Sequence, residues 1–190
     1  AGAKKLGYKN VHTGRMAINS EPRDGRTNCQ QAGFCFQGCK FGAKWSSAYS
    51  DIPKGEATGN LEVRTHAQVL KIEHDGQGKV TGVIYADKDG NQQLQKARIV
   101  AVAGNSIESP RLLLNSASSM FPDGLANSSG QVGKNYMRHM TASMYAVFPE
   151  PVRFWRGTTM AGMITDESIH DPSRGFGGGS ALGPCALGIR

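Results

Sequence analysis

Three cysteines close together in the sequence constrain the local fold more than any other feature. Cys29, Cys35 and Cys39 share one short stretch, and Cys185 lies far from them. A disulfide framework usually spreads its cysteines along the chain and leaves none over. The clustered trio therefore favours a set of ligands or a buried loop over a set of disulfides.

Gly33 and Gly38 alternate with these cysteines and allow the tight backbone that wraps a bound group. Thiolates are the usual ligands of iron–sulfur clusters, and three of them suit a three-iron cluster better than a four-iron one. Zinc is an alternative, although a structural zinc site normally has four ligands, so that Cys185 or His12 would have to complete it. An inert, reduced trio is the third alternative, and the residues alone leave all three open.

Composition narrows the class of protein. The chain has 190 residues, 38% of them hydrophobic, and a net charge of +7 from 22 basic and 15 acidic residues. The basic residues are scattered and not interleaved with aromatic ones, so we expect no nucleic-acid partner. No apolar run reaches the roughly 20 residues of a membrane span, so we expect no transmembrane segment in this chain.

The middle of the chain has the pattern of an antiparallel sheet. Strands are predicted at Leu61–Thr65, Val69–His74, Val80–Ala86 and Gln92–Ala97, and Asp-Gly turns separate the last three. Small and aromatic residues at helical spacing predict a short helix over residues 40–50. The sequence thus predicts a β-meander preceded by a short helix.

A strand, a loop and a helix follow the meander. Ile99–Ala103 is continuously apolar, which is typical of a strand of a parallel sheet that is buried on both faces. Gly104 would let a ligand approach the backbone, and Ser109 and Pro110 predict a helix that begins there. The N–H groups of its first turn would suit an anion. An ordinary structural unit with no ligand is the alternative.

The residues of this unit resemble a known family. The stretch Ala103-Gly104-Asn105-Ser106-Ile107-Glu108-Ser109-Pro110-Arg111-Leu112-Leu113 is similar to the second signature of the glucose–methanol–choline (GMC) flavoprotein oxidoreductases. Residues 60–69 resemble the family's strand pair, and residues 132–139 resemble its Val-Gly-x-Asn-x-x-x-His segment. The resemblance implies FAD as cofactor, with Val69, Ala103 and Gly104 in contact with it.

The resemblance also implies an α/β fold. Residues 1–140 would form part of a Rossmann-like FAD-binding domain with a β-meander insertion, and residues 28–40 would be its cysteine loop. Residues 141–190 would begin an antiparallel-sheet substrate domain with an irregular tail. Ala142–Phe148 alternates as a strand of that sheet.

The cysteine loop resembles one branch of the family. Gly33-Phe34-Cys35-Phe36-Gln37-Gly38-Cys39-Lys40 is similar to the flavoprotein subunits of gluconate 2-dehydrogenase, sorbitol dehydrogenase and FAD-dependent glucose dehydrogenase. That branch implies a 3Fe-4S cluster on Cys29, Cys35 and Cys39, and oxidation of the CH-OH group of a sugar, polyol or sugar acid. It also implies a cytochrome c acceptor subunit, a small accessory subunit and a periplasmic location at the membrane surface.

The resemblance places no catalytic residue in this chain. The family's general base is a histidine near its C-terminal end, and His12, His66, His74, His139 and His170 lack that context. The family's Gly-x-Gly-x-x-Gly phosphate turn is also absent. We therefore expect an internal stretch of an FAD-dependent dehydrogenase. A separate iron–sulfur electron-transfer module and a zinc-stabilised, non-catalytic interaction domain are the alternatives.

Overall fold

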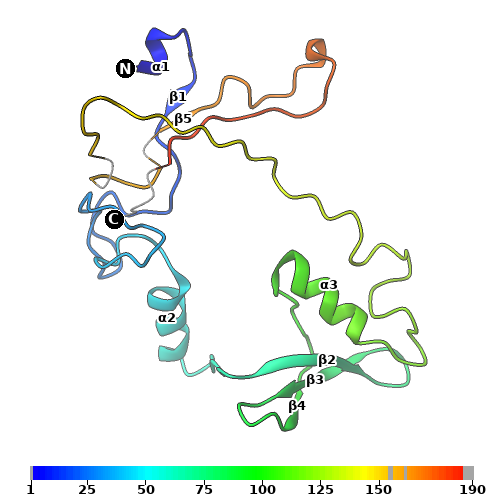
Figure 1. Cartoon of the computed structure of the whole chain (residues 1–190). Helices are drawn as coiled ribbons and strands as arrows, with labels where there is room; N and C mark the ends of the chain where they lie inside the picture. The colour runs from blue at the N-terminus through cyan, green and yellow to red at the C-terminus, as the bar shows by residue number, and fades with distance from the viewer. Residues whose placement is uncertain (1, 154–155, 161, 186–190) are drawn as a thin grey trace. The chain divides into compact units, whose positions relative to one another are not determined.

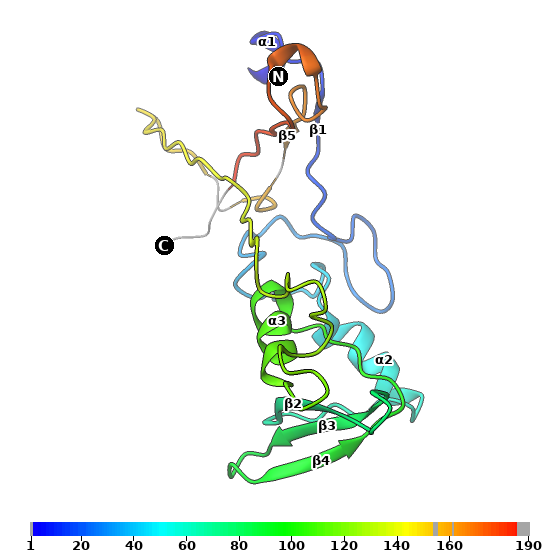
Figure 2. The ribbon, with the colours of Figure 1, turned by 90° about the vertical axis from the view of Figure 1, so that its right-hand side faces the viewer.

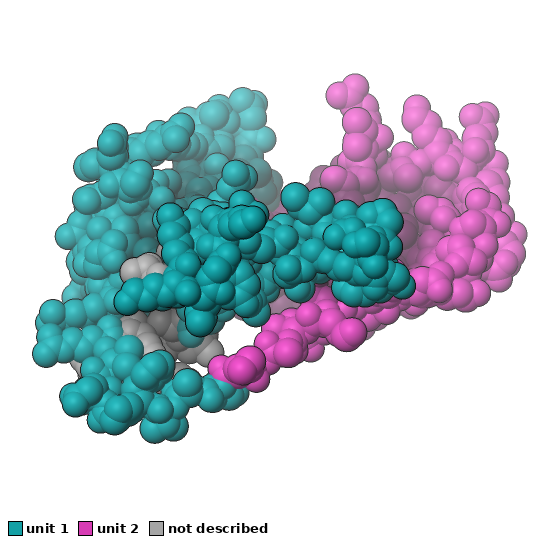
Figure 3. All heavy atoms as spheres, turned by 90° about the horizontal axis from the view of Figure 1, so that it is seen from above, with its two compact units in different colours: residues 1–62, 145–190 teal, residues 63–144 magenta. Residues whose placement is uncertain are grey.

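The computed structural model describes residues 2–153, 156–160 and 162–185, which belong to two compact units (Figure 1). The first unit combines residues 1–62 with residues 145–190, and the second contains residues 63–144 (Figure 3). Each unit is described here by itself. The expected domain division near residue 140 stays a prediction.

An antiparallel meander forms the base of the second unit (Figure 2). Its strands are β2 (Gln68–His74), β3 (Val80–Ala86) and β4 (Gln92–Lys96), in the spatial order β2-β3-β4. This confirms the three strands that alternation and Asp-Gly turns predict. The mixture of helix and antiparallel sheet agrees with the expected α/β class.

The two turns of the meander are built in the same way. The Oδ1 atom of Asp75 accepts the N–H groups of Gln77 and Lys79, both at 2.9 Å. The Oδ1 atom of Asp87 accepts the N–H groups two and four residues further on, at 3.0 and 2.9 Å. An aspartate that bonds its own backbone fixes a turn locally, so the register of the meander is set close to each turn.

The helix α3 (Asn105–Asn115) begins four residues before the predicted start at Ser109. Asn105 adopts a φ of +79°, and its Oδ1 atom accepts two N–H groups of the first turn, at 2.8 and 3.1 Å. Asparagine tolerates this left-handed backbone and caps helices well, which is why the helix begins here. Pro110 consequently lies inside the helix and not at its first position.

A buried hydroxyl joins α3 to the meander. Ser116 directly follows α3 and is 0% exposed. Its Oγ atom donates to the carbonyl of Leu112 at 2.7 Å and accepts the N–H of Ile72 in β2 at 2.9 Å. Ile72 is itself 3% exposed. The end of the helix is thereby hydrogen-bonded to β2, which is an edge strand of the sheet.

Three predicted strands do not form. Leu61–Thr65, Ile99–Ala103 and Ala142–Phe148 belong to no strand, and the side chains of Ile99 and Val147 are 85% and 100% exposed. A strand is stable only when a neighbour accepts and donates its backbone hydrogen bonds. These segments have no ladder partner among the residues that the structure describes, so their apolar pattern alone does not produce a strand.

The first unit consists mostly of loops and contains only a few short helices and strands. These are α1 (Gly2–Lys5), β1 (Val11–His12), η1 (Ser47–Tyr49), α2 (Asp51–Ala57), β5 (Met163–Ile164) and η2 (Pro172–Arg174). β1 pairs with β5, and the carboxylate of Asp166 accepts the N–H groups of Lys9 and Asn10 at 2.8 and 3.0 Å. These bonds join the two distant parts of the chain that make up this unit.

The helix predicted over residues 40–50 is wrong in position. Only the single turn η1 lies in that range, and α2 begins after it, at Asp51. Pro53 lies in the first turn of α2, where a proline costs no hydrogen bond. In the described parts of the chain, no helix is long and apolar enough to cross a bilayer.

Replacing Ser116 tests the contact between α3 and β2. We expect Ser116→Ala to lower the free energy of unfolding by about 1–3 kcal/mol, because it leaves the buried N–H of Ile72 without an acceptor. Urea unfolding of the full chain measures this. Ser119→Ala is the matched control, because Ser119 is exposed. Equal stability of the two variants would contradict this role of the hydroxyl.

Candidate functional site

The structure brings the three clustered cysteines to one cavity in the first unit. Cys29, Cys35 and Cys39 all line it, and its volume is about 20 Å³, which is room for about one water molecule. Lys44 and Gly157 also line it, and the sequence analysis did not find either of them. The cavity gathers the thiols that the motif predicted, and their role as ligands stays a prediction.

Backbone conformation and two long-range bonds position the cysteine loop. Gly33 and Gly38 have φ values of +69° and +95°, a region that glycine enters without strain. The N–H of Gly33 donates to the carbonyl of Gly157 at 3.1 Å. The N–H of Gly157 donates to the carbonyl of Gln31 at 2.7 Å. The predicted need for glycine is thus confirmed, and a segment far along the chain closes the loop.

Backbone N–H groups surround the sulfur of Cys39. Burial raises the pKa of this thiol, and hydrogen bonds from the backbone of residues 41–44 lower it by more, so that the pKa lies below its ordinary value. Cys29 has one such contact, from the N–H of Gln31 at 3.4 Å. This environment stabilises a thiolate, which is the form that binds metals.

The residues that the structure describes contain no complete site for a single metal ion. Among residues 2–153, 156–160 and 162–185, no three His, Cys, Asp or Glu side chains are grouped so that they could hold one ion. Cys185 is exposed and His12 bonds to Thr13 and Thr165, and neither lines the cysteine cavity. The structure therefore does not bring either proposed fourth zinc ligand to the cysteines.

The second unit contains a larger hollow between β2, α3 and the segment that precedes α3. Its volume is about 550 Å³, within the range of small-molecule sites. Val69, Ala103 and Gly104 all line it. The ladder of β2 and β3 skips Leu70, which makes this residue a β-bulge at the edge of the hollow. The three residues that the family resemblance assigns to FAD are thus gathered at one concave surface.

The first turn of α3 offers less to an anion than the sequence suggested. Two of its N–H groups are already bonded to the side chain of Asn105. The N–H of Gly104 donates to the hydroxyl of Ser109 at 3.0 Å. Ser109 therefore accepts a hydrogen bond from the residue before the helix and does not cap the helix start. Asn105 followed by Glu108 is a capping pattern that could have revealed this from the sequence.

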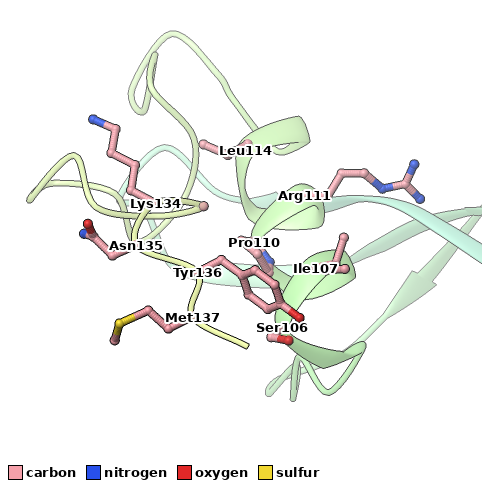
Figure 4. Close-up of a pocket in the computed structure, with 10 residues that line it drawn as sticks. Ser106, Ile107, Pro110, Arg111, Leu114, Lys134, Asn135, Tyr136 and Met137 are labelled. Carbon is pink, nitrogen blue, oxygen red and sulfur yellow. The ribbon is translucent and has the colours of Figure 1, made fainter. Parts of the chain in front are cut away.

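A further hollow lies along another face of α3, where Ser106, Ile107 and Pro110 line it (Figure 4). Tyr136 and Met137 line it from the segment that resembles the family's Val-Gly-x-Asn-x-x-x-His stretch. The hollow measures about 710 Å³. Two of the stretches that carry the family resemblance, residues 103–113 and 132–139, therefore lie side by side in the second unit.

Two of the histidines that the sequence analysis weighed have structural partners. The ring of His74 bonds to the carbonyl of Asp75 and to the hydroxyl of Ser118, both at 2.8 Å, and packs edge-on against Phe121. His12 makes the two contacts described above. Neither histidine lines the hollow beside Val69. That the catalytic base lies outside this chain stays a prediction.

Comparison with known proteins identifies the relatives of this chain. The family model of the GMC oxidoreductases matches residues 1–141. The fructose dehydrogenase large subunit of Gluconobacter japonicus is 34% identical over 162 residues, which cover 85% of this chain and 29% of that protein. The 2-methyl-1,2-propanediol dehydrogenase of Mycolicibacterium austroafricanum is 37% identical over 169 residues, which cover 87% of this chain and 30% of that protein. The chain thus spans about 30% of the length of these relatives.

The pKa of Cys39 gives a direct test. In the metal-free chain we expect iodoacetamide to alkylate Cys39 with a midpoint below about pH 8.5, the value of an unstructured cysteine, because the thiolate is the nucleophile. Peptide mass spectrometry across a pH series measures the midpoint. Denaturation in urea should return it to the ordinary value. A midpoint at or above that value in the folded chain would contradict the effect of the backbone N–H groups.

Proposed function

Because the chain belongs to the GMC oxidoreductase family, we propose that it is part of an FAD-dependent dehydrogenase that oxidises the CH-OH group of a sugar, polyol or sugar acid. One observation carries the proposal: Val69, Ala103 and Gly104 line a single hollow of suitable volume. FAD is the cofactor that this family domain implies. The relatives that carry dehydrogenase names support the class of reaction.

The residues of the hollow fit a flat, largely apolar part of the cofactor. Ala103 has only a methyl side chain and Gly104 has none, so a ring can approach their backbone closely. Val69 lies at the free edge of the meander, beside the bulge at Leu70. We therefore assign the adenine side of FAD to this surface. The side chains of Glu108 and Arg111, which form an ion pair, also line the hollow and would bound the polar end of the ligand.

Bound FAD would supply the chemistry by accepting a hydride from the alcohol carbon. The role of this chain is then to bind and orient the cofactor and to exclude water from one side of it. The base that takes the hydroxyl proton would lie outside this stretch, since none of its histidines has the family context. The substrate pocket would likewise need residues beyond this stretch.

We assign the three cysteines to a 3Fe-4S cluster. Their thiols line one cavity, the backbone around them has the positive φ values of a wrapping loop, and N–H groups surround the sulfur of Cys39. If bound here, the cluster would be held by these three thiolates and would pass on one electron at a time. The cavity would have to widen to admit the cluster.

The proposed partners follow from the need to pass electrons on. A flavin is reduced by two electrons and a haem accepts one, so a one-electron cluster can connect them. We propose a cytochrome c acceptor subunit, a small accessory subunit and a periplasmic location at the membrane surface. One relative is named a large subunit, which is consistent with a multi-subunit enzyme. Family membership favours this function over a separate iron–sulfur module or a zinc-stabilised interaction domain.

Enlarging Ala103 tests the FAD surface. We expect Ala103→Leu to weaken FAD binding by at least about tenfold, or about 1.4 kcal/mol, because the added atoms occupy the hollow. Flavin absorbance titration of the holoprotein measures this, and sugar-dependent reduction of a dye should fall in parallel. Ala117→Leu is the control, since Ala117 is exposed just beyond α3. Unchanged FAD affinity would contradict the assignment.

Removing one thiol tests the cluster. We expect Cys35→Ser to lose most of the iron and of the cluster's electron paramagnetic resonance (EPR) signal, because a hydroxyl is a poor ligand for this metal. Iron analysis of the anaerobically purified holoprotein measures the loss. Cys185→Ser should retain both, since Cys185 does not line the cavity. A wild-type protein without iron would overturn the cluster assignment and leave the FAD assignment standing.

A further inference from the structure

One wall of the hollow beside Val69 has no regular structure of its own. Residues 99–104 line the hollow directly before α3. In the part of the chain that the structure describes, residues 99–103 belong to no ladder, and no backbone hydrogen bond connects them to another segment. The hydrogen bonds that determine the path of this wall are therefore those at the start of α3.

Two side chains of α3 hold the end of this wall. The hydroxyl of Ser109 accepts the N–H of Gly104 at 3.0 Å. The Oδ1 atom of Asn105 accepts the N–H groups of Ile107 and Glu108 at 2.8 and 3.1 Å, and the backbone of Asn105 has a φ of +79°. The chain thus turns from the wall into the helix at Asn105, and the side chain of this residue fixes the turn.

The turn at Asn105 brings the wall close to the first turn of the helix. A β-carbon placed on Gly104 would lie 3.2 Å from the Cβ atom of Glu108, which is a tight contact. Glu108 also lines the hollow, whereas Asn105 does not. A change in the backbone of Asn105 therefore alters the separation of Gly104 and Glu108, and with it the shape of a surface to which Asn105 itself does not belong.

Few residue types suit the position of Asn105. Glycine adopts a φ of +79° easily and asparagine and aspartate tolerate it, but most residues with a β-carbon adopt it at a cost. The two N–H groups of the first turn need a side-chain oxygen as acceptor, which glycine and alanine lack. Asparagine meets both needs, and aspartate is the nearest substitute.

We propose that Asn105 is a positioning residue for the cofactor, a role that rests on the function proposed above. Its side chain holds Ala103 and Gly104 in the conformation against which the adenine side of FAD lies. An ordered wall favours binding, because a binding conformation that is populated only part of the time lowers the apparent affinity by that fraction. Asn105 acts through the wall and does not itself contact FAD.

The test is a titration with FAD, followed by flavin fluorescence, of the complete enzyme that contains this chain after its FAD has been removed. We expect Asn105→Ala to weaken binding by about tenfold, as for a wall that is correctly formed about one tenth of the time. Asn105→Asp should bind within about threefold of the wild type, because it keeps the oxygen and tolerates the backbone. Asn105→Gly keeps the backbone but loses the acceptor, so its affinity should lie between those of the other two.

Asp87→Ala is the matched control. Asp87 accepts two backbone N–H groups of its own turn in the same way, at 3.0 and 2.9 Å. It belongs to the same unit but does not line the hollow. We expect this variant to lose thermal stability and to keep the FAD affinity of the wild type. Equal weakening of FAD binding in Asp87→Ala and Asn105→Ala would show a general loss of stability and overturn the positioning role.

The remaining outcomes separate this role from the proposed function. A wild-type protein that binds no FAD overturns both. If Ala103→Leu weakens FAD binding and Asn105→Ala does not, the FAD surface stands and the positioning role is overturned. If Asn105→Ala does not fold, the other two variants decide. Weaker binding by Asn105→Gly than by Asn105→Asp supports the role, and equal binding overturns it.

Discussion

The arrangement of the second unit depends on a single buried hydroxyl. Ser116 accepts a hydrogen bond from the N–H of Ile72 and donates one to the carbonyl of Leu112. One hydroxyl thus gives a hydrogen-bond partner to a backbone group of β2 and to one at the end of α3. Ser118 meets the ring of His74 on the same strand. These contacts involve residues in the C-terminal half of β2. The hollow assigned to FAD lies beside Val69, near the other end of the strand.

The two candidate sites rely on different physical means. The hollow beside Val69 is defined by regular elements whose spacing the sheet and the helix fix. The cysteine cavity lies in irregular backbone, where positive φ values and the bonds to Gly157 take the place of regular structure. Loops can adopt the close, curved path that several ligands around one group require. The first site therefore suits a flat ligand, and the second suits a compact one.

Local signals predicted the meander and the clustering of thiols, because both depend on residues close in sequence. Alternation and Asp-Gly turns were sufficient for β2, β3 and β4. The apolar run Ile99–Ala103 was misjudged as a strand, since pairing depends on a neighbour that periodicity cannot reveal. The start of α3 was missed because Ser109 and Pro110 outweighed the cap at Asn105. Gly157 could not be found from the sequence, as its contact with the cysteine loop is distant along the chain.

That distant contact has a consequence for the order of assembly. The meander has turns that close within a few residues, so it can form as soon as it leaves the ribosome. The cysteine loop is different, because the backbone of Gly157 completes it, and this residue is synthesised long after Cys39. During synthesis the three thiols therefore lie for a time in an unfinished loop. The cysteine loop is therefore completed late, after the meander can already fold.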